Sequence, residues 1–167
     1  FFAVFKQKYE IGASMSFSKI IPFSDLTLSG LYEILALRAE VFVVEQNCPY
    51  QDLDGKDQGS LHACLSIDDE LWAYCRIIPP GLAYPDSSIG RVVTCSKARG
   101  KGYGKKLMKL SINECWKRYP NNDILIMAQS YLVDFYHEFN FEVEEDEFLE
   151  DGIPHRWMRL KPIKKSQ

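Results

Sequence analysis

The sequence predicts a single α/β domain around a central mixed β-sheet, and three observations support this fold class. Short apolar segments with the length of strands alternate along the chain with segments of helical periodicity. The 167 residues are 46% hydrophobic and 26% charged, proportions that suit one globular domain with its own core. Neither a linker nor an internal repeat divides the chain.

The predicted elements follow one another in the order of an α/β fold. They are strand 17–21, helix 31–45, strands 61–67, 71–78 and 89–95, helix 102–119, strand 124–128, short helix 133–139, and strands 141–145 and 155–160. Apolar residues spaced three and four apart predict the helices, and apolar runs between turn residues predict the strands. The acidic link 68–70 predicts a hairpin, and the nearly continuous apolar run 124–128 predicts a strand buried on both faces.

Composition and charge disfavour several classes of protein. The net charge of -3 gives no overall attraction to nucleic acid. No apolar run reaches the ~18 to 20 residues of a membrane helix, and no signal-peptide pattern is present. The five cysteines are widely spaced without a CxxC pair, which indicates neither a disulfide framework nor a metal site. We therefore expect a soluble, cytoplasmic protein whose domain spans 15–167, with residues 1–14 as an introduced or processed leader.

The most informative segment is the glycine-rich loop Arg99–Gly104, which separates the strand 89–95 from the next helix. Glycines at such a junction let a ligand approach the backbone, and the N-terminus of the helix attracts an anion, so phosphate is the expected ligand. A dinucleotide-binding fingerprint would need glycine at Lys105, and a P-loop would need Ser or Thr at Lys106 and glycine at Arg99, so neither motif is present.

Charged residues are segregated along the chain. Seven basic residues and no acidic residue lie in 91–109, around the glycine-rich loop, and we expect them to favour an anion. Seven of the ten residues in 142–151 are acidic, and Asp52, Asp54 and Asp57 could reinforce the attraction of that run for a cationic amine. The alternative interpretation of the acidic run is a solvated hairpin edge that discourages sheet pairing.

These residues resemble a known family. Arg99–Gly104 matches the pyrophosphate-binding pattern Arg/Gln-x-x-Gly-x-Gly/Ala of the GCN5-related N-acetyltransferase (GNAT) superfamily, and the order of the predicted elements matches its fold. Further segments resemble the ElaA-type branch of that superfamily: 37–54 (LRAEVFVVEQNCPYQDLD), 89–93 (IGRVV), 135–141 and 150–155 (EDGIPH). The resemblance covers nearly all of residues 15–160 and implies a GNAT-like domain with a splayed central sheet flanked by helices.

The resemblance also implies acetyl-CoA as the co-substrate, without a metal. The pantetheine arm would bind the backbone of Val92, Val93 and Thr94, with the N–H of Val93 as the oxyanion donor. The pyrophosphate and the rest of the cofactor would contact Arg99, Gly100, Lys101, Gly102, Tyr103, Gly104, Gln129 and Phe135. Relatives usually have glycine where Asn140 stands, and because asparagine tolerates a left-handed conformation we expect the turn to persist.

Acetyl transfer to an amine needs a neutral amine, a stabilised oxyanion and a proton for the leaving sulfur. The resemblance matches Tyr136 to the tyrosine that protonates the departing thiolate. Glu45, His62 and His155 are the candidates for the base, and the sequence does not choose among them. Cys95 has no evident activating partner, which favours direct transfer without a covalent enzyme intermediate.

The acceptor site is the least defined part of the prediction. Arg38, Phe42 and Arg76 are candidates for binding the acceptor, and either arginine could instead pair internally with Glu45. The expected acceptor is a small-molecule or peptide amine, with neither nucleic acid nor membrane as a partner. Its identity and the oligomeric state stay open, with a homodimer as one option.

The sequence therefore predicts an acetyl-CoA-dependent N-acetyltransferase that acts by direct transfer in a ternary complex. A non-catalytic module that senses CoA is one alternative. A relative of the acyl-homoserine-lactone synthases is a less favoured one, suggested by Arg38, Phe42 and Glu45 on one helix. The intact pyrophosphate loop argues against this second alternative.

Overall fold

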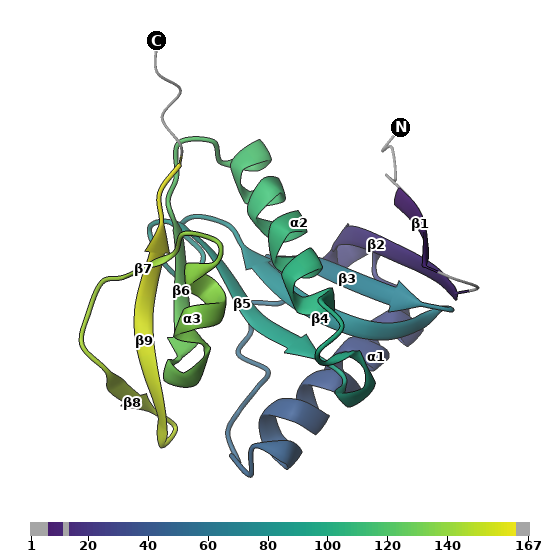
Figure 1. Cartoon of the computed structure of the whole chain (residues 1–167), viewed down its shortest axis with the longest axis horizontal. Helices are drawn as coiled ribbons and strands as arrows, with labels where there is room; N and C mark the ends of the chain where they lie inside the picture. Colours follow the sequence, from purple (N-terminus) through teal and green to yellow (C-terminus); the bar gives the residue numbers. More distant parts are fainter. Residues whose placement is uncertain (1–6, 12–13, 163–167) are drawn as a thin grey trace.

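The structure of the protein, a computed structural model, describes residues 7–11 and 14–162 (Figure 1). The strands of this part of the chain are β1 (Gln7–Ile11), β2 (Ser14–Pro22), β3 (Leu61–Ile67), β4 (Glu70–Ile78), β5 (Ser87–Thr94), β6 (Ile124–Gln129), β7 (Glu142–Val143), β8 (Phe148–Glu150) and β9 (Ile153–Leu160). The helices are α1 (Leu28–Arg38), α2 (Tyr103–Arg118) and α3 (Val133–His137), and a π-helical segment, η2 (Ala39–Glu45), continues α1. Among these helices none is long and apolar enough to cross a membrane.

The strands form one mixed sheet, which confirms the predicted fold class. Its order is β1-β2-β3-β4-β5-β6-β9-β7, and β8 also pairs with β9. The pairing of β5 with β6 is parallel, and the other pairings are antiparallel. The parallel pair is connected by α2, as a crossover between parallel strands requires.

The two halves of the sheet part along the β5–β6 boundary. Only Ser87 and Ser88 of β5 pair with β6, opposite Ile124 and Leu125, although both strands continue beyond these residues. On its other side β5 stays paired with β4 as far as Thr94, with a register shift near Arg76. The splayed sheet expected from the family resemblance is therefore present, and it leaves one edge of β5 without a strand partner.

Helices cover both faces of the sheet (Figure 1). Alternation along β3 and β4 sends Leu65 and Ala73 toward one face, where they share a core with Leu107 of α2. The intervening residues Cys64 and Tyr74 belong to a second core with α1 and η2. Because β3 and β4 are buried on both faces, their middle residues are apolar almost without interruption.

Three elements differ from the sequence prediction. The first predicted strand is longer and pairs with β1, so 7–11 extends the edge of the sheet, whereas the origin of 1–14 stays a prediction. The helix predicted over 31–45 changes from α to π geometry after Arg38. The acidic run also contains β8, which the charge pattern concealed. Asn140 adopts a φ of 65°, which confirms the left-handed turn expected there.

Candidate active site

A cleft of about 820 Å³ opens where β5 and β6 part. One wall consists of β5 and the segment that follows η2, and the opposite wall consists of β6, α3 and the turn between β8 and β9. The predicted site residues that line it are Phe42, Glu45, Arg76, Val92, Val93, Thr94, Arg99, Gln129, Tyr136 and His155. The fold therefore brings together residues separated by more than half of the chain. The predicted site residues outside the cleft lining are Arg38, His62, Gly100, Lys101, Gly102, Tyr103, Gly104 and Phe135.

The glycine-rich loop forms the N-terminal end of α2. Gly100 and Gly102 have φ values of 72° and 79°, and a Cβ at either position would meet no atom within 4 Å, so the loop surface is open to a ligand. Gly102 is the N-cap of α2 and provides no side-chain cap, so the first N–H groups of this 16-residue helix are left for an anion. Phe135 of α3 packs beside Gly104 at 3.7 Å from the position of its missing Cβ.

Several of the basic residues around this loop are engaged in ion pairs or in contacts with an aromatic ring, which the sequence did not suggest. Arg99 pairs with Glu45 at 2.6 Å, and Lys105 pairs with Glu138 at 2.6 Å. Lys97 pairs with Glu70, and the ammonium groups of Lys97 and Lys101 lie 5.3 and 5.1 Å from the ring centre of Trp72. Arg91 points elsewhere, toward Asp52. The basic run is therefore partly neutralised, and Arg91 does not belong to the loop.

The backbone of β5 bears on the choice of the oxyanion donor. The N–H of Cys95 donates to the carbonyl of Trp72 at 2.9 Å, and hydrogen-bond direction alternates along an antiparallel strand. We therefore infer that the N–H of Val93, which stands opposite Tyr74, faces β4. By the same alternation the N–H groups of Val92 and Thr94 face the unpaired edge, so the strand geometry favours these two groups over the N–H of Val93 as donors to an oxyanion.

Tyr136 lies at the bottom of the cleft on α3. Its side chain is 5% exposed and packs edge to face against Phe135 and Phe141. Burial raises the pKa of Tyr136, so the phenol is protonated at neutral pH. None of the described residues forms a hydrogen bond with the Tyr136 hydroxyl, which leaves it free to donate to a ligand.

The three candidate bases differ in their surroundings. His155 lines the cleft, and its Nδ1 lies 2.8 Å from the carbonyl oxygen of Ile153. Because a carbonyl only accepts, the neutral ring carries its proton on Nδ1, and Nε2 has a lone pair available as a base. Glu45 also lines the cleft, but Arg99 holds its carboxylate.

His62 is fully buried on β3, away from the cleft. Its Nε2 lies 3.1 Å from the carbonyl oxygen of Asp57, and its Nδ1 lies 2.9 Å from the hydroxyl of Tyr74. Both ring nitrogens are therefore engaged, and burial lowers the pKa of His62. This arrangement does not fit the predicted role of His62 as a catalytic base.

The predicted acceptor-binding arginines are part of a buried ionic cluster, which we call the Arg–Asp network. Its members are Arg38, Arg76, Arg91, Asp52, Asp54 and Asp57. Arg38 donates to Asp52 and Asp57, each at 2.9 Å, and Arg76 donates to Asp54 at 2.6 Å and to Asp57 at 2.8 Å. The arginines pair internally, as one alternative anticipated, but with aspartates and not with Glu45.

The aspartates of the network also differ from expectation. Asp52 and Asp57 are each 6% exposed and neutralise arginines, so they do not offer free charge to a cationic amine. Burial alone would raise the pKa of Asp54, but hydrogen bonds from Arg76 outweigh it and lower that pKa. In the sequence, the signal for these internal ion pairs is the presence of two arginines on otherwise apolar faces and of three aspartates in one loop.

A hydrogen-bonded amide pair spans the cleft. Gln46, which follows η2, donates to Gln129 at the end of β6 at 3.4 Å, and Gln129 donates back at 3.1 Å. Nearby, the Sγ of Cys48 lies 3.6 Å from the carbonyl oxygen of Asp151. These contacts join the two walls of the cleft, a role for Gln129 that the sequence did not reveal.

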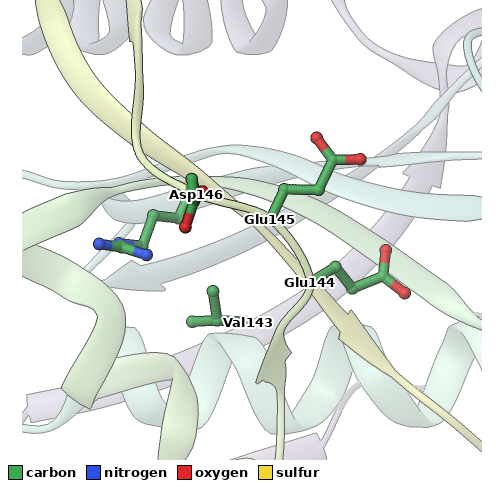
Figure 2. A pocket seen from close by; sticks show the side chains of 5 residues that line it. Val143, Glu144, Glu145 and Asp146 are labelled. Carbon is green, nitrogen blue, oxygen red and sulfur yellow. The ribbon is translucent and has the colours of Figure 1, made fainter.

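Only the end of the acidic run reaches the cleft. Glu150 and Asp151 line it, whereas Val143, Glu144, Glu145 and Asp146 surround a separate shallow pocket (Figure 2). Glu144 also pairs with Arg159 of β9. Within the described residues, no group of three or more His, Cys, Asp and Glu side chains could hold a metal ion.

Comparison with known proteins agrees with this geometry. Residues 29–162 match the family model described as the acetyltransferase (GNAT) domain. A UPF0039 protein of Synechocystis is 43% identical over 134 residues, which cover 80% of this chain and 87% of that protein. Protein ElaA of Escherichia coli is 40% identical over 142 residues, which cover 84% of this chain and 93% of that protein.

Two solved structures are similar in fold and sequence. A crystal structure of an acyl-CoA N-acyltransferase from Pseudomonas aeruginosa matches with a TM-score of 0.81 and 39% identity. The crystal structure of Escherichia coli ElaA matches with a TM-score of 0.81 and 38% identity. Each match covers 85% of this chain and 97% of the other.

The buried His62 predicts a pH dependence of stability. The pKa of His62 is lowered in the folded protein. Below pH 6.5, which is about the pKa of histidine in the unfolded chain, the unfolded chain therefore binds more protons, and the free energy of unfolding decreases as the pH is lowered. His62→Gln is expected to reduce this slope between about pH 6.5 and pH 5 by up to about 1.4 kcal/mol per pH unit. Urea unfolding at several pH values measures it. The exposed His137→Gln is the control, and an unchanged slope in His62→Gln would contradict the prediction.

Proposed function

The chain belongs to the GNAT acetyltransferase family, and we propose that it transfers an acetyl group from acetyl-CoA directly to an amine. The observation that carries this proposal is the unpaired edge of β5 in the cleft, where Arg99 also lines the cleft and begins the glycine-rich loop that leads to the uncapped N-terminus of α2. A helix N-terminus suits a pyrophosphate, and an unpaired strand edge suits the amide groups of a pantetheine arm.

The proposed binding mode follows the shape of the cleft. The loop from Arg99 to Gly104 would bind the pyrophosphate through its N–H groups, with Arg99 and Lys101 adding positive charge. The N–H of Val92 would donate to the thioester carbonyl oxygen, and the N–H of Thr94 would donate to the pantetheine arm. Gln129 and Phe135 would contact the co-substrate from the opposite wall. The glycines support this fit because no side chain covers the loop.

The proposed reaction forms a C–N bond and breaks a C–S bond. Nε2 of His155 accepts a proton from the acceptor nitrogen, directly or through water, because an alkylammonium must lose a proton before it attacks. The negative charge that develops on the carbonyl oxygen is stabilised by the β5 N–H donors. Tyr136 donates its proton to the leaving sulfur, and the second proton that the attacking nitrogen loses restores the Tyr136 phenol through water. The products are the N-acetyl amine, CoA with a free thiol, and one proton released to solvent.

The acceptor is proposed to be a cationic amine. Glu150 and Asp151 line the cleft, and neither has an ion-pair partner among the described residues, whereas Glu45 and Asp54 are paired with arginines. Carboxylates of this kind raise the local concentration of a cation at the mouth of the cleft. Phe42 lies on the same wall as Glu45 and would contact the apolar part of the acceptor.

The proposal is tested by measuring thiol release from acetyl-CoA across a panel of small amines and lysine peptides. We expect release that depends on the amine, with a product heavier by one acetyl group in mass spectrometry. CoA binding without turnover on any acceptor would overturn the proposal and would favour a CoA-sensing module. Absence of CoA binding would overturn both functions.

Tyr136→Phe tests the proton donor. The substitution keeps the packing against Phe135 and Phe141 but removes the hydroxyl, so kcat is expected to fall about 10²-fold while the affinity for CoA is retained. Steady-state kinetics and calorimetry measure the two quantities. Tyr32→Phe on the exposed side of α1 is the matched control. A wild-type kcat for Tyr136→Phe would remove this residue from the acid role.

His155→Gln tests the base. We expect kcat/KM for the acceptor to fall about 10²-fold or more, because the amide cannot accept a proton from the amine. His137→Gln, on the exposed face of α3, should keep the wild-type value. If Glu45→Gln abolishes activity while His155→Gln retains it, the base is Glu45 and our choice of His155 is refuted.

A further inference from the structure

Arg91 combines an unusual backbone conformation with a position next to the proposed donors. Its φ is 53°, in the left-handed region that residues other than glycine rarely adopt. It lies in a bulge, because Gly90 opposes Arg76 while Val93 already opposes Tyr74. The peptide unit between Arg91 and Val92 carries the N–H of Val92, so the backbone conformation of Arg91 sets the direction of that donor.

The side chain of Arg91 is anchored to the segment 50–57 that follows η2. Its Nε donates to Oδ1 of Asp52 at 2.7 Å, and one terminal nitrogen donates to the carbonyl oxygen of Asp52 at 3.0 Å. The guanidinium also lies over the ring of Tyr50, 5.6 Å from its centre, and the Tyr50 hydroxyl donates to the same Oδ1 at 2.8 Å. The Arg91 guanidinium is therefore held both by hydrogen bonds to Asp52 and by its contact with the ring of Tyr50.

Asp52 is itself a rigid anchor. It is 6% exposed, and the fully buried Arg38 donates to its other carboxylate oxygen at 2.9 Å and to its carbonyl oxygen at 3.2 Å. A strained backbone conformation persists when its surroundings over-determine it. The Arg–Asp network supplies that restraint, because Asp52 cannot shift without separating from Arg38.

We propose that Arg91 is a positioning residue for acyl transfer: its clamp on Asp52 holds the β5 bulge so that the N–H of Val92 is aimed at the thioester carbonyl oxygen. Arg91 itself does not touch the reacting atoms. The inference rests on the proposed function, since it assigns Arg91 a part in that reaction. It also links the loop 50–57 to the rate of transfer.

Arg91→Gly and Arg91→Lys test the clamp. Glycine adopts the left-handed conformation without strain but loses the side chain, whereas lysine keeps a charge that can reach one acceptor. We expect Arg91→Gly to lower kcat on the order of 10²-fold, and Arg91→Lys to lower it less. The affinity for free CoA should stay at the wild-type value, because CoA has no thioester carbonyl for Val92 to bind.

Arg118→Ala is the matched control, since it removes an exposed arginine from an ion pair on α2. It should change neither kcat nor CoA affinity. A wild-type kcat for Arg91→Gly would overturn the proposal. A parallel loss of kcat and CoA affinity in both Arg91 variants would also overturn it, because that pattern indicates general damage to the cleft.

A second measurement does not depend on turnover. Amide hydrogen exchange is followed at Val93, Cys95 and the segment 50–57 in wild type and Arg91→Gly, because the N–H groups of Val93 and Cys95 face β4. The clamp predicts faster exchange at Val93 and in 50–57 of the variant, with α2 unchanged. Equal exchange would refute the clamp even in a protein that acetylates nothing, whereas faster exchange without transfer by wild type would refute only the proposed function.

Discussion

The parting of β5 from β6 is the constraint on which the rest of the site depends. A strand edge inside a fold presents N–H and C=O groups that need partners, and β5 has such an edge beyond Ser88. Both the cleft and the donors at Val92 and Thr94 follow from this edge. The glycine-rich loop lies at the end of the same strand, so one ligand chain could pair with β5 and place its phosphates on α2. The amide pair of Gln46 and Gln129 links the two walls.

The Arg–Asp network gives order to a wall that has little regular structure. The segment between η2 and β3 has no strand or helix, yet three of its aspartates are fixed by arginines from α1, β4 and β5. Removing one partner of a buried ion pair costs about 3 to 5 kcal/mol, because the other charge is left without compensation. The network therefore makes the wall rigid, and it cancels most of the charge it buries. For the cationic acceptor that we propose, the attracting charge would come instead from Glu150 and Asp151, which line the cleft.

The runs of like charge in the sequence do not show which charges are left unpaired in the folded protein. Three residues of the basic run form ion pairs with Glu45, Glu70 and Glu138, which come from η2, β4 and the end of α3. Of the acidic run, Glu144, Glu145 and Asp146 surround a separate pocket (Figure 2), and only Glu150 and Asp151 line the cleft. In the proposed binding mode, selectivity for an anion at the loop would therefore depend more on the helix N-terminus and its free N–H groups than on the number of lysines.

The sequence by itself determined the order of the elements, the glycine-rich loop and the family, because each is encoded by residues close together in the chain. Periodicity over a few turns predicts a helix, and glycines at one junction predict an open N-terminus. The tertiary structure decided which side chains meet. Arg38 and Asp57 are 19 residues apart, and Arg91 and Asp52 are 39 apart, so no local pattern revealed their pairing. The same long-range packing buried His62, placed His155 in the lining of the cleft, and set which N–H groups of β5 face β4, because a bulge and a strand register are set by the partner strand.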